Sequence, residues 1–445
     1  MSSSSRRRSL VAGFLAVVAT AACGSNSVIG HQSGTGGAAG TGTNPGTAGA
    51  GGVAGVSGDA GTVGTAGAPG TAGMGGSADG CASAAGGAAG TGVAFLPAVQ
   101  YPTHRSSMFV ALGDLNGDGR PDLVVANALA AEGRLPSGGG PTNIGGSVSI
   151  FLSEGSSGYG PPRHYVQEFR PTSAAVGDLN GDGKADVAVS NFQSVTMLLN
   201  DGAGALSAPV DYATGTYPSS IAIGDLNGDG MNDLAVANTG GESTGDVAVL
   251  LNIGNRMFAA TNYPAGAGPV HVAIGDLNDD GKPDLAVSSG ASVNVLFNLG
   301  NGFAPPANYG AGTNPSNVVI VDLNSDGRPD LAVGRDFSGA AVILSTGAEV
   351  FAAAVIYPFP PSSAQVAIGD LNFDGKPDVV SATLVSCGAV MFRLNAGNGT
   401  FGDLGSIAVN LSPSSVSVGD LNRDGKPDIV VSHSDGVAVL LNAAP

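Results

Sequence analysis

Short hydrophobic runs recur in a fixed order along most of this chain. In the clearest copy the runs fall at residues 258–263 (FAATNY), 270–275 (VHVAIG), 285–288 and 293–298 (VNVLFN), separated by Gly, Pro, Asn and Asp. Short β-branched or apolar runs bounded by turn residues are typical of strands, and none of them has the period and length of a helix. The pattern therefore predicts repeats of four strands each.

Every repeat also carries the polar motif Asp-Leu-Asn-x-Asp-Gly-x-x-Asp between two apolar runs. The start-to-start spacings are 64, 47, 51, 46, 48 and 50 residues, which gives seven copies. Repeat periods near 50 residues are typical of propellers and solenoids, and seven is a common number of blades. The sequence predicts an all-β fold, a seven-bladed β-propeller with four-stranded blades over residues 92–445.

The two ends of the repeat array complement each other. The last repeat stops at residues 437–442 (VAVLLN) without its final strand, whereas residues 95–101 (FLPAVQY) supply a spare strand before the first polar motif. A closed ring, in which the N-terminal strand completes the last blade, leaves no open sheet edge. We expect that closure rather than an open solenoid.

Oxygen-bearing side chains occupy positions 1, 3, 5 and 9 of each polar motif. In the first copy the carbonyl of Arg120 is available at position 7, and Gly119 permits a sharp turn at position 6. Calcium takes six to eight hard oxygen ligands in flexible geometry, whereas magnesium requires a near-ideal octahedron. We therefore expect up to seven Ca²⁺ ions, one per loop, and because each loop has its own ligands we expect independent sites. The predicted ligands are Asp114, Asn116, Asp118 and Asp122; Asp178, Asn180, Asp182 and Asp186; Asp225, Asn227, Asp229 and Asp233; Asp276, Asn278, Asp280 and Asp284; Asp322, Asn324, Asp326 and Asp330; Asp370, Asn372, Asp374 and Asp378; and Asp420, Asn422, Asp424 and Asp428.

Two other interpretations of the motif fit less well. Asp, Asn and Gly also form ordinary β-turns, but positions 1, 5 and 9 of the motifs hold 3 × 7 = 21 of the 35 acidic residues, and crowding them without a counter-ion is costly. Seven Ca²⁺ would change the formal charge from −18 to −18 + 14 = −4. An EF-hand requires Glu at position 12, where six copies have Val and one has Ser381, and the GGxGxD tandem of another calcium-binding repeat does not occur.

With these motifs the repeats resemble FG-GAP/VCBS repeats, the unit of the integrin α-chain propeller and of many bacterial surface proteins. Residues 266–269 (GAGP) and Phe258 stand near the family's Gly-Pro turn and Phe positions, whereas Tyr159 and Leu206 occupy the Phe site in other copies. The resemblance implies that calcium lies in the hairpin between the first and second strands of each blade, where it rigidifies the hairpin. It also implies that ligands bind the opposite face.

Two features belong to that opposite face. An insertion at residues 127–146 lengthens the first repeat, and it serves either binding or plain length variation. Ring closure also brings the 101–107 connection, with His104 and Arg105, near the turn that holds His433 and Asp435. This cluster is either an anion or sugar site or a solvated polar rim.

The N-terminal 91 residues differ in composition from the repeats. Residues 1–23 combine three arginines, an apolar stretch and small residues before Cys23, which predicts a lipoprotein signal peptide with Cys23 as the lipidated residue; an ordinary signal peptide is the alternative. Residues 5–10 weakly resemble a twin-arginine signal. Residues 24–91 are rich in Gly, Ala and Thr, which predicts a disordered tether. Cys81 and Cys387 are a possible disulfide in an oxidising compartment.

Composition and motifs together disfavour several classes of partner and function. A net charge of −18 repels both nucleic acid and anionic lipid, so we expect no nucleic-acid partner and membrane contact only through a lipid anchor. We also expect a monomer. The five histidines are His31, His104, His164, His271 and His433, and they lie in no catalytic signature. We expect an exported protein, either a cell-surface or outer-membrane lipoprotein or a secreted one, that binds a glycan, matrix or protein ligand. A structural envelope scaffold and a polysaccharide-active enzyme with its site on the opposite face are the alternatives.

Overall fold

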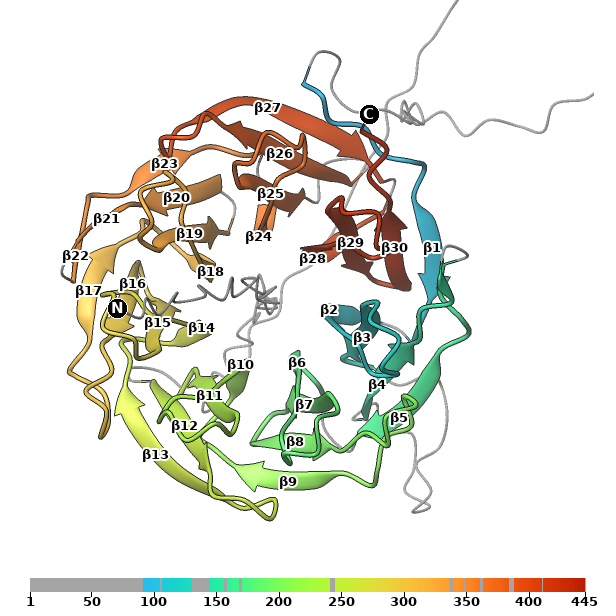
Figure 1. Ribbon diagram of the computed structural model, residues 1–445, viewed down its shortest axis with the longest axis vertical. Helices are drawn as coiled ribbons and strands as arrows, with labels where there is room; N and C mark the ends of the chain where they lie inside the picture. Colours follow the sequence, from blue (N-terminus) through green and yellow to red (C-terminus); the bar gives the residue numbers. More distant parts are fainter. Residues whose placement is uncertain are drawn as a thin grey trace, which may run out of the picture. The chain divides into compact units, whose positions relative to one another are not determined.

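A computed structural model describes residues 91–444 except 105, 130–144, 156–157, 168–169, 241–244, 337–338, 348, 361–362, 384–387 and 410. These residues form seven four-stranded antiparallel sheets arranged in a ring (Figure 1). They include no helix, and hence none long and apolar enough to cross a membrane. The predicted all-β, seven-bladed propeller is therefore confirmed.

Each blade begins with its innermost strand and ends with its outermost strand. Blades 1 and 2 contain β2 Ser107–Gly113, β3 Asp122–Asn127, β4 Gly146–Phe151 and β5 Arg163–Gln167, then β6 Ser173–Gly177, β7 Asp186–Ser190, β8 Ser194–Leu198 and β9 Val210–Ala213. Blades 3 and 4 contain β10 Pro218–Gly224, β11 Asp233–Asn238, β12 Asp246–Asn252 and β13 Phe258–Pro264, then β14 Pro269–Gly275, β15 Asp284–Ser289, β16 Ser292–Leu296 and β17 Ala307–Gly310. Blades 5 and 6 contain β18 Pro315–Val321, β19 Asp330–Arg335, β20 Gly339–Ile343 and β23 Val355–Tyr357, then β24 Ser363–Gly369, β25 Asp378–Thr383, β26 Ala389–Asn395 and β27 Phe401–Ala408. Blade 7 contains β28 Pro413–Gly419, β29 Asp428–His433, β30 Gly436–Leu440 and β1 Val99–Pro102, and a small hairpin of β21 Ser345–Gly347 and β22 Val350–Phe351 is added to blade 5.

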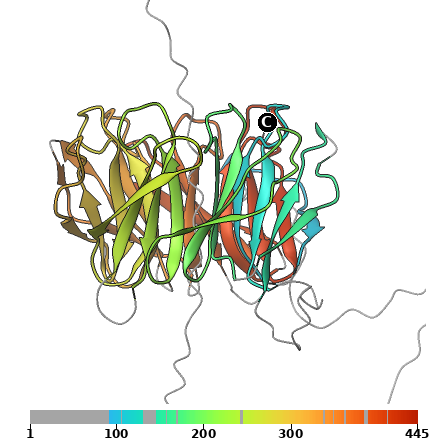
Figure 2. The same cartoon turned by 90° about the horizontal axis from the view of Figure 1, so that it is seen from below.

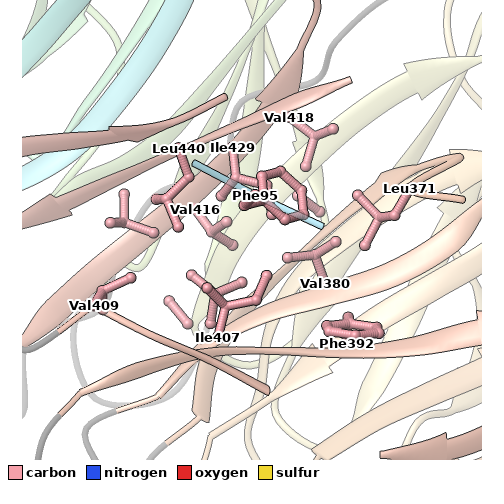
Figure 3. Packing of buried hydrophobic residues seen from close by; sticks show 14 of the residues in the cluster. Phe95, Leu371, Val380, Phe392, Ile407, Val409, Val416, Val418, Ile429 and Leu440 are labelled. Atoms are coloured by element: carbon pink, nitrogen blue, oxygen red, sulfur yellow. The ribbon is translucent and has the colours of Figure 1, made fainter. Parts of the chain in front are cut away.

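The N-terminal strand closes the ring. β1 pairs antiparallel with β30, from Val99 opposite Val439 to Pro102 opposite Gly436, and becomes the outermost strand of blade 7. Ahead of β1, Phe95 pairs with Asn442, and its ring is 5% exposed. Figure 3 shows this ring among apolar side chains that come from blades 6 and 7. The closure predicted from the two ends of the repeat array is confirmed.

The hydrophobic core lies between the blades. The described residues contain seven buried clusters, and each joins the facing sheets of two neighbouring blades. The second strand of every blade is buried along its whole length, whereas an outermost strand such as β13 is largely exposed. Strands run between the two faces of the ring (Figure 2), so loops gather at both faces.

Aromatic pairs add a contact between neighbouring blades. Tyr263 of blade 3, for example, meets Phe303 of blade 4 edge-on, with ring centroids 5.2 Å apart. Phe303 pairs with Asn298, and Tyr159 and Leu206 make the corresponding bridges in blades 1 and 2. This confirms that both residues occupy the Phe site. Similar edge-on pairs are Tyr101–Phe151, Tyr101–Tyr159, Tyr212–Phe258, Tyr309–Phe351 and Tyr357–Phe401.

Several sequence predictions lie outside the described residues. They are the signal peptide at 1–23 with Cys23, the tether at 24–90, the pair Cys81 and Cys387, Arg105, and residues 130–144 of the insertion. These stay predictions.

Candidate metal centres

The seven polar motifs all lie at the same end of their blades. Each one connects the first strand to the second, as β2 ends at Gly113 and β3 begins at Asp122 in blade 1. The turns between second and third strands, and the connections from one blade to the next, therefore lie at the opposite end. The expected position of the motif in the first hairpin is confirmed.

The first half of each loop is organised by its own side chains. In blade 1 the Asp114 carboxylate accepts hydrogen bonds from the backbone N–H groups of Gly117 at 2.7 Å and Gly119 at 2.6 Å. Asn116 Oδ1 accepts from the N–H of Asp118 at 2.9 Å, and Asp118 Oδ1 accepts from that of Arg120 at 2.8 Å. In the other six loops position 1 accepts the N–H of the glycine at position 6, and positions 3 and 5 make the bonds described for Asn116 and Asp118. The bond from the N–H of position 4 to position 1 recurs at Gly181 and Gly228.

Two residues of each loop adopt a left-handed backbone. The glycine at position 6 has φ of 79° in Gly119, and the other six lie between 80° and 87°, which agrees with the predicted sharp turn. Position 4 is also left-handed. It is Gly in three loops but Asp279, Ser325, Phe373 and Arg423 in the others, with φ between 60° and 62°. The variable residue type at position 4 gave no sequence signal for this requirement.

The aspartate at position 9 is a buried anchor. Asp284 is 0% exposed; its Oδ2 accepts the N–H of Leu277 at 2.9 Å and its Oδ1 that of Asn298 at 2.7 Å. The first bond holds the loop and the second holds the end of the third strand. The corresponding six aspartates are equally buried and make both bonds.

Burial raises the pKa of all seven position-9 carboxyl groups above their ordinary value of 3.8. The pKa is about 6 in Asp122, Asp284 and Asp428 and about 7 in Asp378, and it is also raised in Asp186, Asp233 and Asp330. Backbone hydrogen bonds lower these values in part, whereas the carboxylates at positions 1 and 5 of the same loop raise them further. A neighbouring cation would favour the charged form of these groups.

A recurring Asn at or just after the end of the third strand connects the loops of neighbouring blades. Asn298 Nδ2 donates to the carbonyl of Leu226, in the loop of the preceding blade, at 2.7 Å, and to the carbonyl of Pro283, in its own loop, at 2.9 Å. Asn200, Asn252, Asn395 and Asn442 make the equivalent bond to the preceding blade. Hydrogen bonds therefore connect neighbouring loops at five of the seven junctions, whereas the independence of the seven metal sites stays a prediction.

The two remaining junctions use different contacts. Blades 1 and 5 have Ser153 and Ser345 in place of Asn. Between blades 7 and 1, Arg423 Nη1 instead donates to the carbonyl of Asp118 at 3.1 Å. Between blades 4 and 5, Asn278 Nδ2 donates to Glu349 Oε1 at 3.3 Å. Every junction therefore has a polar contact at the face that holds the loops.

The donor set of each loop fits a hard divalent cation. Its side-chain ligands are all carboxylate or amide oxygens, and an oxygen that accepts one N–H keeps a second lone pair. At positions 5 and 7, Lys282 and Lys376 contact Asp280 and Asp374 at 2.9 and 3.2 Å, which are exposed pairs of small energetic weight. No three His, Cys, Asp or Glu side chains in the described part of the chain form a metal-binding group by themselves; the predicted ligands of each loop also include an Asn and a carbonyl.

The polar cluster at the opposite face is formed only in part. The closure connection contacts the blade 7 turn as expected, because the N–H of Thr103 donates to the Asp435 carbonyl at 3.1 Å. His104, however, stacks on His164, with ring centroids 3.9 Å apart, and its Nδ1 contacts Ser147 Oγ at 2.8 Å. Burial lowers the pKa of His104, His164 and His433. The sequence analysis missed the His104–His164 stack, since the two residues belong to segments 60 positions apart.

Comparison with known proteins agrees with this architecture. The model of the FG-GAP-like repeat matches residues 178–236, 225–287, 276–333, 322–381 and 370–431, and that of the FG-GAP repeat matches residues 108–151. No curated protein sequence matches the chain. Among solved structures, an Agrocybe aegerita lectin described as recognising non-reducing terminal N-acetylglucosamine is 18% identical, with a TM-score of 0.50, over 75% of this chain and 87% of its own.

A second similar structure is BBS1N, solved in complex with ARL6DN. It is 14% identical, with a TM-score of 0.53, and the match covers 79% of this chain and 97% of BBS1N. At such identities the likeness shows the fold alone. The FG-GAP-like matches alone span more than half of the chain and include six of the seven polar loops, and the FG-GAP match includes the seventh. The chain therefore belongs to the FG-GAP repeat family.

Proposed function

We propose that this protein is an exported, cell-surface binding module whose propeller is held together by up to seven calcium ions. One observation carries the proposal: seven loops present the same oxygen donors at one face, and each is anchored by a buried aspartate that forms no salt bridge with a described side chain. A bound cation stabilises the folded chain by RT ln(1 + [L]/Kd) per site, so even weak sites add up over seven blades.

A binding role is supported by the family and by the division of the two faces. FG-GAP repeats are typical of extracellular and surface proteins, and their propellers are typically non-enzymatic. Similar propellers recognise a glycan in the lectin and a protein partner in BBS1N. Because the loops occupy one face, we assign ligand binding to the opposite face. The candidate ligands are a glycan, a matrix component or a protein, and no described side-chain arrangement favours an enzyme.

The calcium part of the proposal is tested by metal content and stability. The purified full-length protein is dialysed against millimolar CaCl₂, and bound calcium is measured by elemental analysis with MgCl₂ as the parallel control. We expect close to seven calcium ions per chain, little retained magnesium, and a lower Tm after chelation. An absence of bound calcium, or a Tm that chelation leaves unchanged, would refute it.

The binding part is tested separately, by screening the same protein against glycans, matrix components and surface proteins with and without calcium. A specific ligand supports the binding module. A protein that holds calcium but binds nothing in either condition would instead be the structural scaffold.

The export part is tested by labelling cells with a fatty acid analogue. Labelling that Cys23→Ser abolishes supports a lipid anchor, and equal labelling of the two proteins contradicts it.

A further inference from the structure

The face opposite the metal loops carries an exposed aromatic pair. Phe192, in the turn between β7 and β8, is 48% exposed, and Tyr217, in the connection from β9 to β10, is 42% exposed. Their ring centroids lie 4.4 Å apart at an interplanar angle of 88°. Both segments lie at the ends of their strands away from the polar loops, where blades 2 and 3 meet. The pair therefore presents apolar surface to solvent at one defined junction.

Packing does not explain Tyr217. The tyrosines on the outer strands, such as Tyr212 and Tyr263, pack edge-on against the next blade, whereas Tyr217 contacts only the exposed ring of Phe192 among the described aromatic residues. Two large aromatic rings that stay exposed lose the favourable free energy that buried aromatic rings contribute to folding. A surface pair of this kind is more typical of a recognition site than of a structural element.

The backbone of Tyr217 adds a second cost. Its φ is 58°, a left-handed conformation that an aromatic residue rarely adopts. The residue at the same place, one before the innermost strand, is also left-handed in blades 1, 4 and 5, where it is Ser106, Gly268 and Asn314. Small or turn-forming residues thus fill this place in other blades. A tyrosine that accepts backbone strain and exposure together suggests a role for its ring.

Two unpaired hydrogen-bond acceptors lie close to the aromatic pair, one next to Phe192 in the chain and one on the strand residue that pairs with Pro218, next to Tyr217. Asn191, next to Phe192, is 2% exposed and its Oδ1 has no partner among the described residues. Asn238 is 1% exposed with an equally unpartnered Oδ1, and it packs under the Tyr217 connection: a Cβ added to Gly215 would lie 2.5 Å from its Nδ2. Buried acceptors without a donor are uncommon and costly. A ligand with hydroxyl donors would satisfy them.

We propose that Phe192 and Tyr217 form a platform for a neutral sugar ring, with the Asn191 and Asn238 amide oxygens as acceptors for its hydroxyl groups. The C–H face of a pyranose is a weakly positive apolar surface that packs on the negative face of an aromatic ring. A neutral ligand also suits a chain with a formal charge of −18, which repels anions. This inference rests on the proposed function in one respect, the assignment of ligand binding to the face opposite the metal loops.

The test uses the full-length protein in calcium buffer on an array of neutral glycans, followed by affinity measurements on the strongest glycan. The variants are Phe192→Ala and Tyr217→Gly. Each removes one ring, and we expect either change to weaken binding about tenfold or more. Because glycine favours the left-handed backbone, Tyr217→Gly should keep or raise the Tm while it loses binding, so that misfolding cannot explain the loss.

Phe373→Ser is the matched control. Phe373 is also an exposed, left-handed aromatic residue, at 38% exposure and φ of 61°, but it lies in a polar loop on the other face, where blade 5 has Ser325. The Phe373→Ser protein should bind the glycan as tightly as the unmodified protein does. Glycan binding that both platform variants keep would overturn the platform and leave the binding module intact. Binding of a protein but of no glycan, abolished by Tyr217→Gly, would overturn the sugar assignment. A chain that binds neither glycan nor protein would overturn the binding function itself.

Discussion

At the residue scale, the asparagine at or just after the end of the third strand joins neighbouring blades in a way that the sequence did not predict. Asn298 is 3% exposed and joins two loops through Leu226 and Pro283, while its Oδ1 accepts the N–H of Gly300 at 2.8 Å. Asn298→Ala leaves these buried groups unsatisfied, so we expect the free energy of unfolding to fall by about 1–3 kcal/mol, measured by urea denaturation.

Blade 5 provides the matched control for this prediction. Ser345 of blade 5 stands where blade 4 has Asn298. Ser345→Asn therefore adds an amide that can donate to a carbonyl in the loop of the preceding blade, and this change should be neutral or stabilising. An Asn298→Ala protein as stable as the unmodified chain would show that the bond between the loops contributes nothing.

The buried aspartates at position 9 predict how pH and calcium act together. Their folded-state pKa is raised from 3.8 to about 6 in Asp284 and about 7 in Asp378, so protonation favours the folded chain. In the calcium-free protein, the stabilisation of the folded chain by these raised pKa values is complete below about pH 4 and is lost as the pH rises through 6 to 7. Calcium requires the ionised form, so its stabilising effect should grow over the same range.

The measurement is the difference in Tm between calcium-loaded and calcium-free protein at several pH values from about 5 to 8. We expect this difference to increase with pH. The lowered pKa values of His104, His164 and His433 act in both samples and cancel in the difference. A difference that is constant or that shrinks with pH would contradict the assignment of these carboxylates to the metal sites.

How much of the site the sequence predicts depends on sequence distance. Positions 1, 3, 5 and 6 were predictable because their bonds close within five residues, as in the Gly119 to Asp114 contact. The bond from Asn298 to Leu226 spans 72 residues, so its partner is set by the neighbouring blade and not by the motif. Position 2 of the motif was likewise given no role from the sequence. In blade 4 it is Leu277, which is 3% exposed and packs in the cluster between blades 4 and 5.

At the element scale, the strands follow the hydrophobic runs closely. The run predicted at 270–275 is β14, Pro269–Gly275, and the run at 285–288 is β15, Asp284–Ser289. The last run was predicted to reach residue 298, whereas β16 ends at Leu296, because the backbone of Asn298 turns to Asp284 and Phe303. The β21–β22 hairpin of blade 5 was not predicted; its pairing of Ser345 with Phe351 stands where blades 1, 2 and 4 have isolated bridges such as Asn298 to Phe303.

The closing strand gives the element-scale prediction. β1 itself is mostly exposed, so its attachment to blade 7 depends on backbone pairing and on the buried ring of Phe95. Phe95→Ala removes this ring from the cluster between blades 6 and 7, and we expect a loss of about 3–5 kcal/mol in the free energy of unfolding.

The neighbouring Leu96 is 51% exposed, so Leu96→Ala serves as the control and should change stability by less than about 0.5 kcal/mol. Urea denaturation of both variants measures the contrast. Equal stability of the two would mean that the ring is closed by backbone pairing alone.

At the scale of the whole molecule, charge is concentrated on one face. The seven loops hold 22 of the 35 acidic residues, three at the fixed positions of each loop plus Asp279, and all seven loops lie at the same end of the blades. Like charges gathered in this way repel one another, and the repulsion opposes the compact ring unless cations neutralise it. The face opposite carries none of these loops, so a ligand bound there would not contact a cation held in them.

Monovalent salt should therefore stabilise the calcium-free protein more than the calcium-loaded protein. Raising KCl from about 20 mM to about 300 mM shortens the screening length from roughly 20 Å to roughly 6 Å, which weakens repulsion between loops of neighbouring blades. With seven Ca²⁺ bound the formal charge would already be −4, so little repulsion remains to be screened. The Tm of both forms is measured in KCl and in choline chloride, whose larger cation tests screening without site binding. Equal salt effects on the two forms would mean that carboxylate repulsion does not limit the stability of the ring, and the argument for calcium from net charge would then fail even if the loops bind the ion.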